Sequence, residues 1–250
     1  MAKTPAKRKP AAAAAAVKKK PAAPPAPPKT PPSPPVAPAT TAPLPKPVPL
    51  VPFVQVQPNL PAFPAGVFYI NYFDGITDAK VRGLMALFSD ILAKVKPTPA
   101  TIYMTLSSPG GSVDAGITFY NFLTGLPVDL IIHNIGSVDS IATVIFLAAR
   151  KRYACAHSRF LFHGVMSEFG AGTRLTTAQI LEVANRLSQD ERRIKELVVA
   201  NSKLSEMEML ALFQQGETKD AAFALEKGII DDIRDFALPA GAQIVTANFQ

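Results

Sequence analysis

The chain has 250 residues, of which 48% are hydrophobic, and a formal net charge of +7. Nine Lys and Arg residues and no acidic residue lie in the first 50 positions. The other 17 basic residues therefore face all 19 acidic ones, and their balance is 17 − 19 = −2. The basic character thus belongs to the N-terminal segment and does not indicate a nucleic-acid-binding groove on the rest of the chain. No apolar run reaches the roughly 18 residues that a membrane span needs, so we expect none.

The chain divides into two regions by composition. Residues 1–64 contain 20 of the 25 prolines and long alanine runs. Such a segment cannot bury enough apolar surface to offset the entropy of ordering it. We therefore expect a disordered tail rich in Pro, Ala and Lys over residues 1–64, and one folded domain over residues 65–250. The tail could make weak contacts with nucleic acid or with an acidic partner.

The expected location is the cytoplasm, with no membrane association. Ala11–Val17 is a poor core for a signal peptide, because Lys18–Lys20 follow it at once. The lone Cys155 excludes a disulfide within the chain and is typical of a reducing compartment.

Strands and helices are predicted to alternate along residues 65–250. Short apolar runs predict strands over 67–72, 101–106, 128–135, 152–156 and 160–162. Apolar residues at helical spacing predict helices over 77–95, 113–123, 141–149, 177–201 and 221–227, and a capping box at Ser205-x-x-Glu208 begins one more. This alternation indicates an α/β fold with mostly parallel strands.

Three stretches carry the residue types of a serine hydrolase. The first is Ser108-Pro-Gly-Gly, whose glycines can offer backbone N–H groups to an oxyanion. The second runs from Gly136 to Ser140, at the start of an apolar helix where free N–H groups face the serine oxygen. The third is Ser158-Arg-Phe-Leu-Phe-His163, which ends in a histidine able to accept the serine proton and return it to a leaving amine.

The order and spacing of these stretches resemble the ClpP family, the proteolytic subunits of Clp proteases. The resemblance covers most of residues 66–235 and implies a ClpP/crotonase-like spiral of strand-strand-helix repeats with a projecting handle helix. It also implies that Ser140 is the nucleophile and His163 its base, with the backbone N–H groups of Gly110 and Ile141 as the oxyanion hole. Neither a metal nor another cofactor is implied.

Two positions depart from the family pattern. The family places an aspartate about twelve residues before the glycine that corresponds to Gly228, and here that position is Gly216. Glu217 lies one residue later and is the expected triad carboxylate, which would hold the histidine in the right tautomer. Asp220 is the alternative. Asp139 stands where the family has a small residue, and we expect its side chain to point away from the site.

The resemblance implies a serine endopeptidase that cleaves polypeptides inside a homo-oligomeric chamber of stacked heptameric rings. An AAA+ ATPase unfoldase is expected to supply substrates, because the chain has no Gly-x-x-x-x-Gly-Lys-Ser/Thr loop of its own. Helix 177–201 is expected to make ring-to-ring contacts through Leu187 and Ile194. The alternatives are a catalytically degenerate ring-forming homologue and a crotonase-type acyl-CoA enzyme. Processing of phage capsid proteins is an alternative role for an active enzyme.

Overall fold

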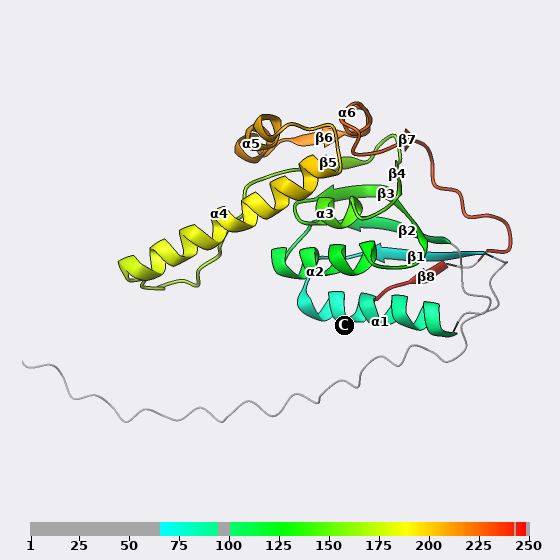
Figure 1. Cartoon of the computed structure of the whole chain (residues 1–250), viewed down its shortest axis with the longest axis horizontal. Coiled ribbons are helices and arrows are strands. Elements are labelled where there is room, and N and C mark those ends of the chain that lie inside the picture. Colours follow the sequence, from blue (N-terminus) through cyan, green and yellow to red (C-terminus); the bar gives the residue numbers. More distant parts are fainter. Residues whose placement is uncertain (1–65, 95–100, 243, 249–250) are drawn as a thin grey trace, which may run out of the picture. The chain divides into compact units, whose positions relative to one another are not determined.

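The computed structural model describes residues 66–94, 101–242 and 244–248, and the expected tail, residues 1–64, lies outside them. Strands and helices alternate along the described chain, as predicted (Figure 1). The strands are β1 Val67–Phe73, β2 Thr101–Ser108, β3 Asp129–Asp139, β4 Lys151–Ala154, β5 Arg159–Leu161, β6 Thr218–Asp220, β7 Asp232–Ile233 and β8 Ile244–Thr246. The helices are α1 Asp78–Lys94, α2 Val113–Thr124, α3 Ala142–Phe146, α4 Thr177–Ala200, α5 Glu206–Gln215 and α6 Ala221–Glu226.

The strands form one mixed sheet in the order β6-β5-β3-β2-β1-β8, in which only the β5–β6 pair is antiparallel. One edge of β3 pairs with two strands, one after the other along its length. Its residues 131–134 pair with β4, and its residues 137–139 pair with β5. This division brings β5 alongside the end of β3, and therefore brings the segment after β5 next to the residue that follows β3.

Two helices pack together over one face of the sheet. The rings of Phe88 on α1 and Phe119 on α2 meet edge to face, with their centroids 5.8 Å apart, and both side chains are fully buried. α3 is shorter than the predicted span of residues 141–149, but all five of its residues are buried, as its continuous apolar sequence predicts. Burial of these apolar side chains supplies the main driving force for folding.

The three-residue strands β6 and β8 are absent from the predicted strands, because neither contains an alternating apolar pattern. β8 extends the sheet beyond β1, where Tyr69 pairs with Ile244. The N–H of Ala247 then donates to the carbonyl of Asn71 at 2.8 Å. β6 pairs with β5 and places Thr218 opposite Leu161.

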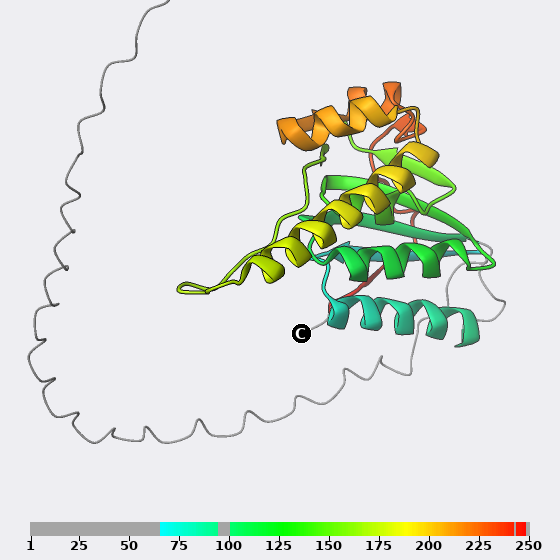
Figure 2. The same cartoon turned by 60° about the vertical axis from the view of Figure 1, so that its left-hand side comes forward.

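Helix α4 projects from the sheet and its covering helices, as expected for a handle (Figures 1 and 2). Its N-cap is Thr176, which forms a capping box with Gln179. Only Ile194 and Val198 of α4 are buried, so the expectation that Ile194 contacts another ring is wrong: Ile194 packs into the core. No helix in the described part of the chain is long and apolar enough to cross a membrane.

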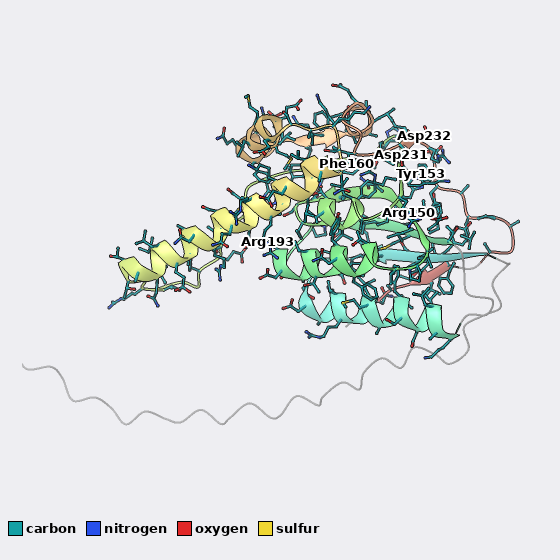
Figure 3. The ribbon with its side chains drawn as sticks, viewed as in Figure 1. Arg150, Tyr153, Phe160, Arg193, Asp231 and Asp232 are labelled. Carbon is teal, nitrogen blue, oxygen red and sulfur yellow. The ribbon has the colours of Figure 1, made fainter. Side chains whose placement is uncertain are left out.

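An ion-pair cluster joins α4 to the start of α2. Arg193 donates to Asp114 at 2.8 Å and to Asp190 at 3.0 Å, and its position on α4 is labelled in Figure 3. The cluster therefore fixes the base of the handle beside the turn that contains the paired glycines.

Candidate active site

Ser140 lies in a sharp turn between β3 and α3. Its φ of 57° makes it the one non-glycine residue with a positive φ in the described part of the chain. For an L-residue this conformation costs about 1–2 kcal/mol, and three hydrogen bonds hold it here. The Ser140 N–H donates to Leu161 at 2.8 Å, and the Ser140 carbonyl accepts from the N–H and the hydroxyl of Thr143 at 3.0 and 2.7 Å. Strain of this kind is typical of a residue held for function.

The Gly110–Gly111 turn lies directly against Ser140. A Cβ at Gly110 would be 2.6 Å from Ser140 Cβ and 2.7 Å from the carbonyl oxygen of Asp139. Gly110 also has a φ of +87°, so this position needs glycine for both space and conformation. Its N–H donates to Oγ of Ser108 at 3.2 Å, and its carbonyl accepts from Ile76 at 2.7 Å.

His163 follows β5, and its ring has one nitrogen occupied. Nδ1 lies 2.7 Å from the carbonyl oxygen of Gly164. Since a carbonyl can only accept, Nδ1 carries the proton in this contact, and the neutral ring keeps the lone pair on Nε2. Two helices hold the adjoining backbone: Gly164 donates to Phe213 of α5 at 3.3 Å, and Val165 donates to Glu191 of α4 at 3.1 Å.

A groove of about 600 Å³ joins these parts. Ser140, His163 and Gly110 all line it, so the structure brings together the three residues that the motifs singled out. Apolar and charged side chains from α2, α4 and the segment after His163 line the rest of the groove: Val113, Asp114, Val165, Met166, Glu168, Arg186, Leu187 and Asp190. The lining of the groove is therefore of mixed polarity.

The second expected oxyanion donor, the N–H of Ile141, makes no hydrogen bond within the described residues. Ser140 and His163 are not joined by a hydrogen bond in the same part of the chain. Catalytic hydrogen bonds are often long in enzymes without a substrate and tighten in the complex. Chemically, the groove offers a hydroxyl, an imidazole with a free lone pair and backbone N–H groups.

The structure does not bring Glu217 or Asp220 to His163. Glu217 is exposed and pairs with Lys219 at 3.1 Å. Asp220 is the N-cap of α6 and accepts from Phe223 at 2.8 Å. Gly216 ends α5 in the left-handed conformation, with a φ of 60°. The antiparallel register of β5 and β6, continued by two residues, places Gly216 opposite His163.

Asp139 points inward, contrary to expectation. The residue is only 6% exposed. Arg159 donates to its Oδ2 at 3.4 Å, whereas its buried Oδ1 has no hydrogen-bond partner within the described residues. Burial raises the pKa of Asp139, while the charges of Arg159 and, to a smaller extent, His163 lower it. The sequence reading ended this strand at residue 135, because a glycine and polar residues follow, and so it missed the last paired positions of β3.

The other two histidines lie apart from this groove. His133 is fully buried on β3, where its Nδ1 meets the hydroxyl of Tyr103 at 2.7 Å and its Nε2 meets the carbonyl of Arg234 at 3.0 Å. Both nitrogens are therefore satisfied, which indicates a structural role for His133. Within the described residues, no group of three or more His, Cys, Asp or Glu side chains could hold a metal ion.

Comparison with known proteins agrees with this geometry. The family model for Clp protease matches residues 72–236. The ATP-dependent Clp protease proteolytic subunit of Lactococcus lactis subsp. cremoris is 28% identical over 164 residues, which are 65% of this chain and 78% of that protein. Proteolytic subunit 2 of Treponema pallidum is 29% identical over 160 residues, 63% of this chain and 75% of that protein. The match includes all three motif stretches and the whole groove, and the chain belongs to the Clp protease family of peptidases.

Proposed function

We propose that this protein is a serine endopeptidase in which Ser140 attacks the peptide carbonyl and His163 takes the serine proton. The observation that carries the proposal is that Ser140, His163 and Gly110, which come from three separate turns, line one groove. The free lone pair on Nε2 of His163 is the base that such an attack requires. After attack, the same nitrogen returns the proton to the leaving amine.

The N–H groups of Gly110 and Ile141 are proposed to bind the oxyanion. That of Ile141 has no competing acceptor within the described residues. That of Gly110 makes a long bond, 3.2 Å, to the neutral hydroxyl of Ser108. A charged oxyanion is a stronger acceptor than a hydroxyl, so it should displace Ser108 from this N–H.

The carboxylate that orients His163 is the least supported member of the proposed site. Glu217 stays the prediction drawn from the family resemblance, but it has to leave Lys219 to reach the histidine. The carbonyl of Gly164 already performs one of the tasks of a triad acid, because it fixes the proton on Nδ1. The carbonyl of Gly164 cannot perform the second task of a triad acid, which is to place a negative charge beside the imidazolium.

A fluorophosphonate probe gives the direct test of this mechanism. It should label the protein at Ser140, and both Ser140→Ala and His163→Ala should lower peptide cleavage by more than about 10³-fold, since nucleophile and base act as a unit. Both variants should keep the melting temperature and assembly of the parent. Labelling at another residue, or an alanine variant that keeps a tenth of the parent activity, would refute these assignments.

The second candidate is a ring-forming subunit with a degenerate site. It is favoured by one observation: within the described residues, no carboxylate contacts His163. This candidate predicts assembled rings with neither probe labelling nor peptide cleavage, so the same experiment separates the two.

We further propose a cytoplasmic chamber of stacked heptameric rings that receives polypeptides from an AAA+ unfoldase. Apolar side chains on the projecting half of α4 support the assembly, since Ile180 and Leu181 are 53% and 59% exposed. Light scattering after size exclusion should give a ring-sized mass. Folded proteins should be degraded only when the ATPase and ATP are both added, and a stable monomer would contradict the chamber.

A further inference from the structure

Asp139 is a buried carboxylate next to the proposed nucleophile, and the mechanism described above leaves it without a task. Its residue is 6% exposed, and its Oδ1 has no partner within the described residues. Burying an ionisable group in this way is costly unless a charge or hydrogen bond compensates. The long contact to Arg159, at 3.4 Å, compensates only one of the two oxygens. Such a group is a candidate for a role in the site.

The strand register places Asp139 near His163. Asp139 pairs with Leu161 on β5, and the N–H of the following residue, Ser140, donates to the carbonyl of the same Leu161. His163 lies two residues beyond Leu161, and so on the same side of the chain where the extended backbone continues. Asp139 and His163 are therefore diagonal neighbours on one side of the β3–β5 pair. When the His163 ring is protonated, its positive charge lowers the pKa of Asp139, which agrees with this placement.

Of the other carboxylates near the groove, Glu168 is exposed to solvent, and the rest have partners. Glu217 pairs with Lys219, and Asp220 caps α6. On α4, Glu191 accepts from the N–H of Val165. Asp139 is therefore the buried acid whose negative charge is least compensated among the carboxylates around His163.

We propose that ionised Asp139 acts on His163 as a positioning residue, stabilising the imidazolium that forms when His163 takes the proton from Ser140. The proposal rests on the proposed function and supplies the negative charge that position 216 lacks. No bond forms to Asp139 and no proton passes to it: the proton moves from Oγ of Ser140 to Nε2 of His163, and then to the leaving amine. The charge of Arg159 opposes the rise in pKa that burial causes, and so favours the ionised form of Asp139.

Other charged groups also face His163, and their effects on it have to be distinguished from the effect of Asp139. The groove that His163 lines contains Asp114 from α2, Glu168 from the following segment, and Arg186 and Asp190 from α4. Asp114 and Asp190 are both paired with Arg193. Around Asp139 itself the charged groups are Arg159 and His163, and β2 contributes the uncharged Ser108 opposite the preceding residue, Val138.

The first test does not depend on activity. In protein labelled with ¹³C at histidine Cε1, the three imidazole signals are assigned with His→Gln variants and followed as a function of pH. Removing the negative charge with Asp139→Asn should move the His163 titration midpoint to lower pH. We expect a shift of about 0.5–1 pH unit, below the roughly 1–3 units of a direct contact, because the two groups are diagonal neighbours and Arg159 opposes the effect. His133 should not shift by the same amount.

The second test uses the rate of labelling of Ser140 by the fluorophosphonate probe. In Asp139→Asn the plateau rate should fall about 3–10-fold, the equivalent of the expected 0.5–1 pH unit. The acid limb of the pH profile of labelling should move to lower pH by the same shift of about 0.5–1 pH unit. A purely structural role for Asp139 would lower the plateau without moving the limb.

Two variants guard against misinterpretation. Asp139→Ala restores a small residue at this position, so it should give the same shift if Asp139→Asn fails to fold. Asp232→Asn is the matched control, since it also replaces an arginine-paired aspartate by asparagine on a strand of the same sheet, outside the groove. The proposal is overturned if the His163 midpoint is unchanged in both Asp139 variants, or if Glu217→Gln or Glu168→Gln produces the shift instead. Absence of probe labelling in the parent would refute the proposed function, whereas the NMR shift would still decide the coupling.

Discussion

Gly110→Ala should damage both stability and activity, for separable reasons. At a φ of +87°, the left-handed conformation of an alanine residue destabilises the folded state by about 1–2 kcal/mol. Its Cβ would also lie 2.6 Å from Ser140 Cβ, about 1 Å closer than the usual 3.5–4.0 Å contact between carbons. Relieving that overlap should cost a further 1–3 kcal/mol or so. At about 2–4 °C per kcal/mol for a domain of this size, the melting temperature should fall by roughly 4–20 °C.

Gly241→Ala is the matched control for the strain alone. Gly241 has a φ of +79° and nothing within 4 Å of an added Cβ. The control should therefore lose about 1–2 kcal/mol of stability from its backbone conformation alone, which lowers the melting temperature by roughly 2–8 °C. Its rate of probe labelling should match that of the parent.

The activity of Gly110→Ala should fall much further than its stability suggests. Displacing Ser140 or the Gly110 N–H by about 1 Å is enough to lower the rate about 10²-fold. Labelling rates with a fluorophosphonate probe, measured at a temperature where both variants are folded, check this directly. Equal melting temperatures for the two variants, together with a parent-like labelling rate for Gly110→Ala, would refute the contact between Gly110 and Ser140.

Three further changes test other parts of the molecule. Glu217→Gln should leave the labelling rate within about threefold, because Glu217 pairs with Lys219; a loss near 10⁴-fold, the extreme for a triad aspartate, would identify it as the triad acid. Burial lowers the pKa of His133 from 6.5, so the neutral form is favoured on folding and its stabilising contribution is lost as pH falls below 6.5. Urea midpoints should therefore fall more steeply with acidification in the parent than in His133→Phe, and parallel curves would contradict this. Deleting residues 1–60 should move the melting temperature by less than about 5 °C, since no predicted core position is removed, and a larger drop would show that the tail packs on the domain.

The motifs predicted which residues meet in the groove better than they predicted the contacts that hold those residues. A serine after an apolar strand, a Gly-Gly turn and a histidine at the end of another strand each have a local signature, and the structure brings all three to one groove. The partner of the His163 ring nitrogen has no such signature, because it is a backbone carbonyl, that of Gly164. A main-chain acceptor leaves no residue preference to detect.

The secondary structure was likewise predicted where it has a local sequence signal, and was missed where it depends on contacts with distant residues. The long helix 177–201 was predicted to within one residue, because apolar residues at helical spacing along its length are a strong local signal. The inward orientation of Asp139 was missed, because the continuation of β3 past Ile135 depends on pairing with β5 rather than on its own residues. Likewise, Ile194 is apolar and helical in sequence, but only the docking of α4 on the core decides that it is buried.

The pairing of β1 with β8 has a consequence for the order in which the chain can fold during synthesis. β1 can meet β2 as soon as residue 108 has been made, but its other edge waits for residues 244–246, so 244 − 69 = 175 positions separate Tyr69 from its partner Ile244. Throughout that interval β1 presents unpaired backbone groups of the kind that recruit strands from other molecules. Nascent or truncated chains that stop before β8 should therefore be the species most dependent on chaperones, because β8 is the strand that covers the second edge of β1.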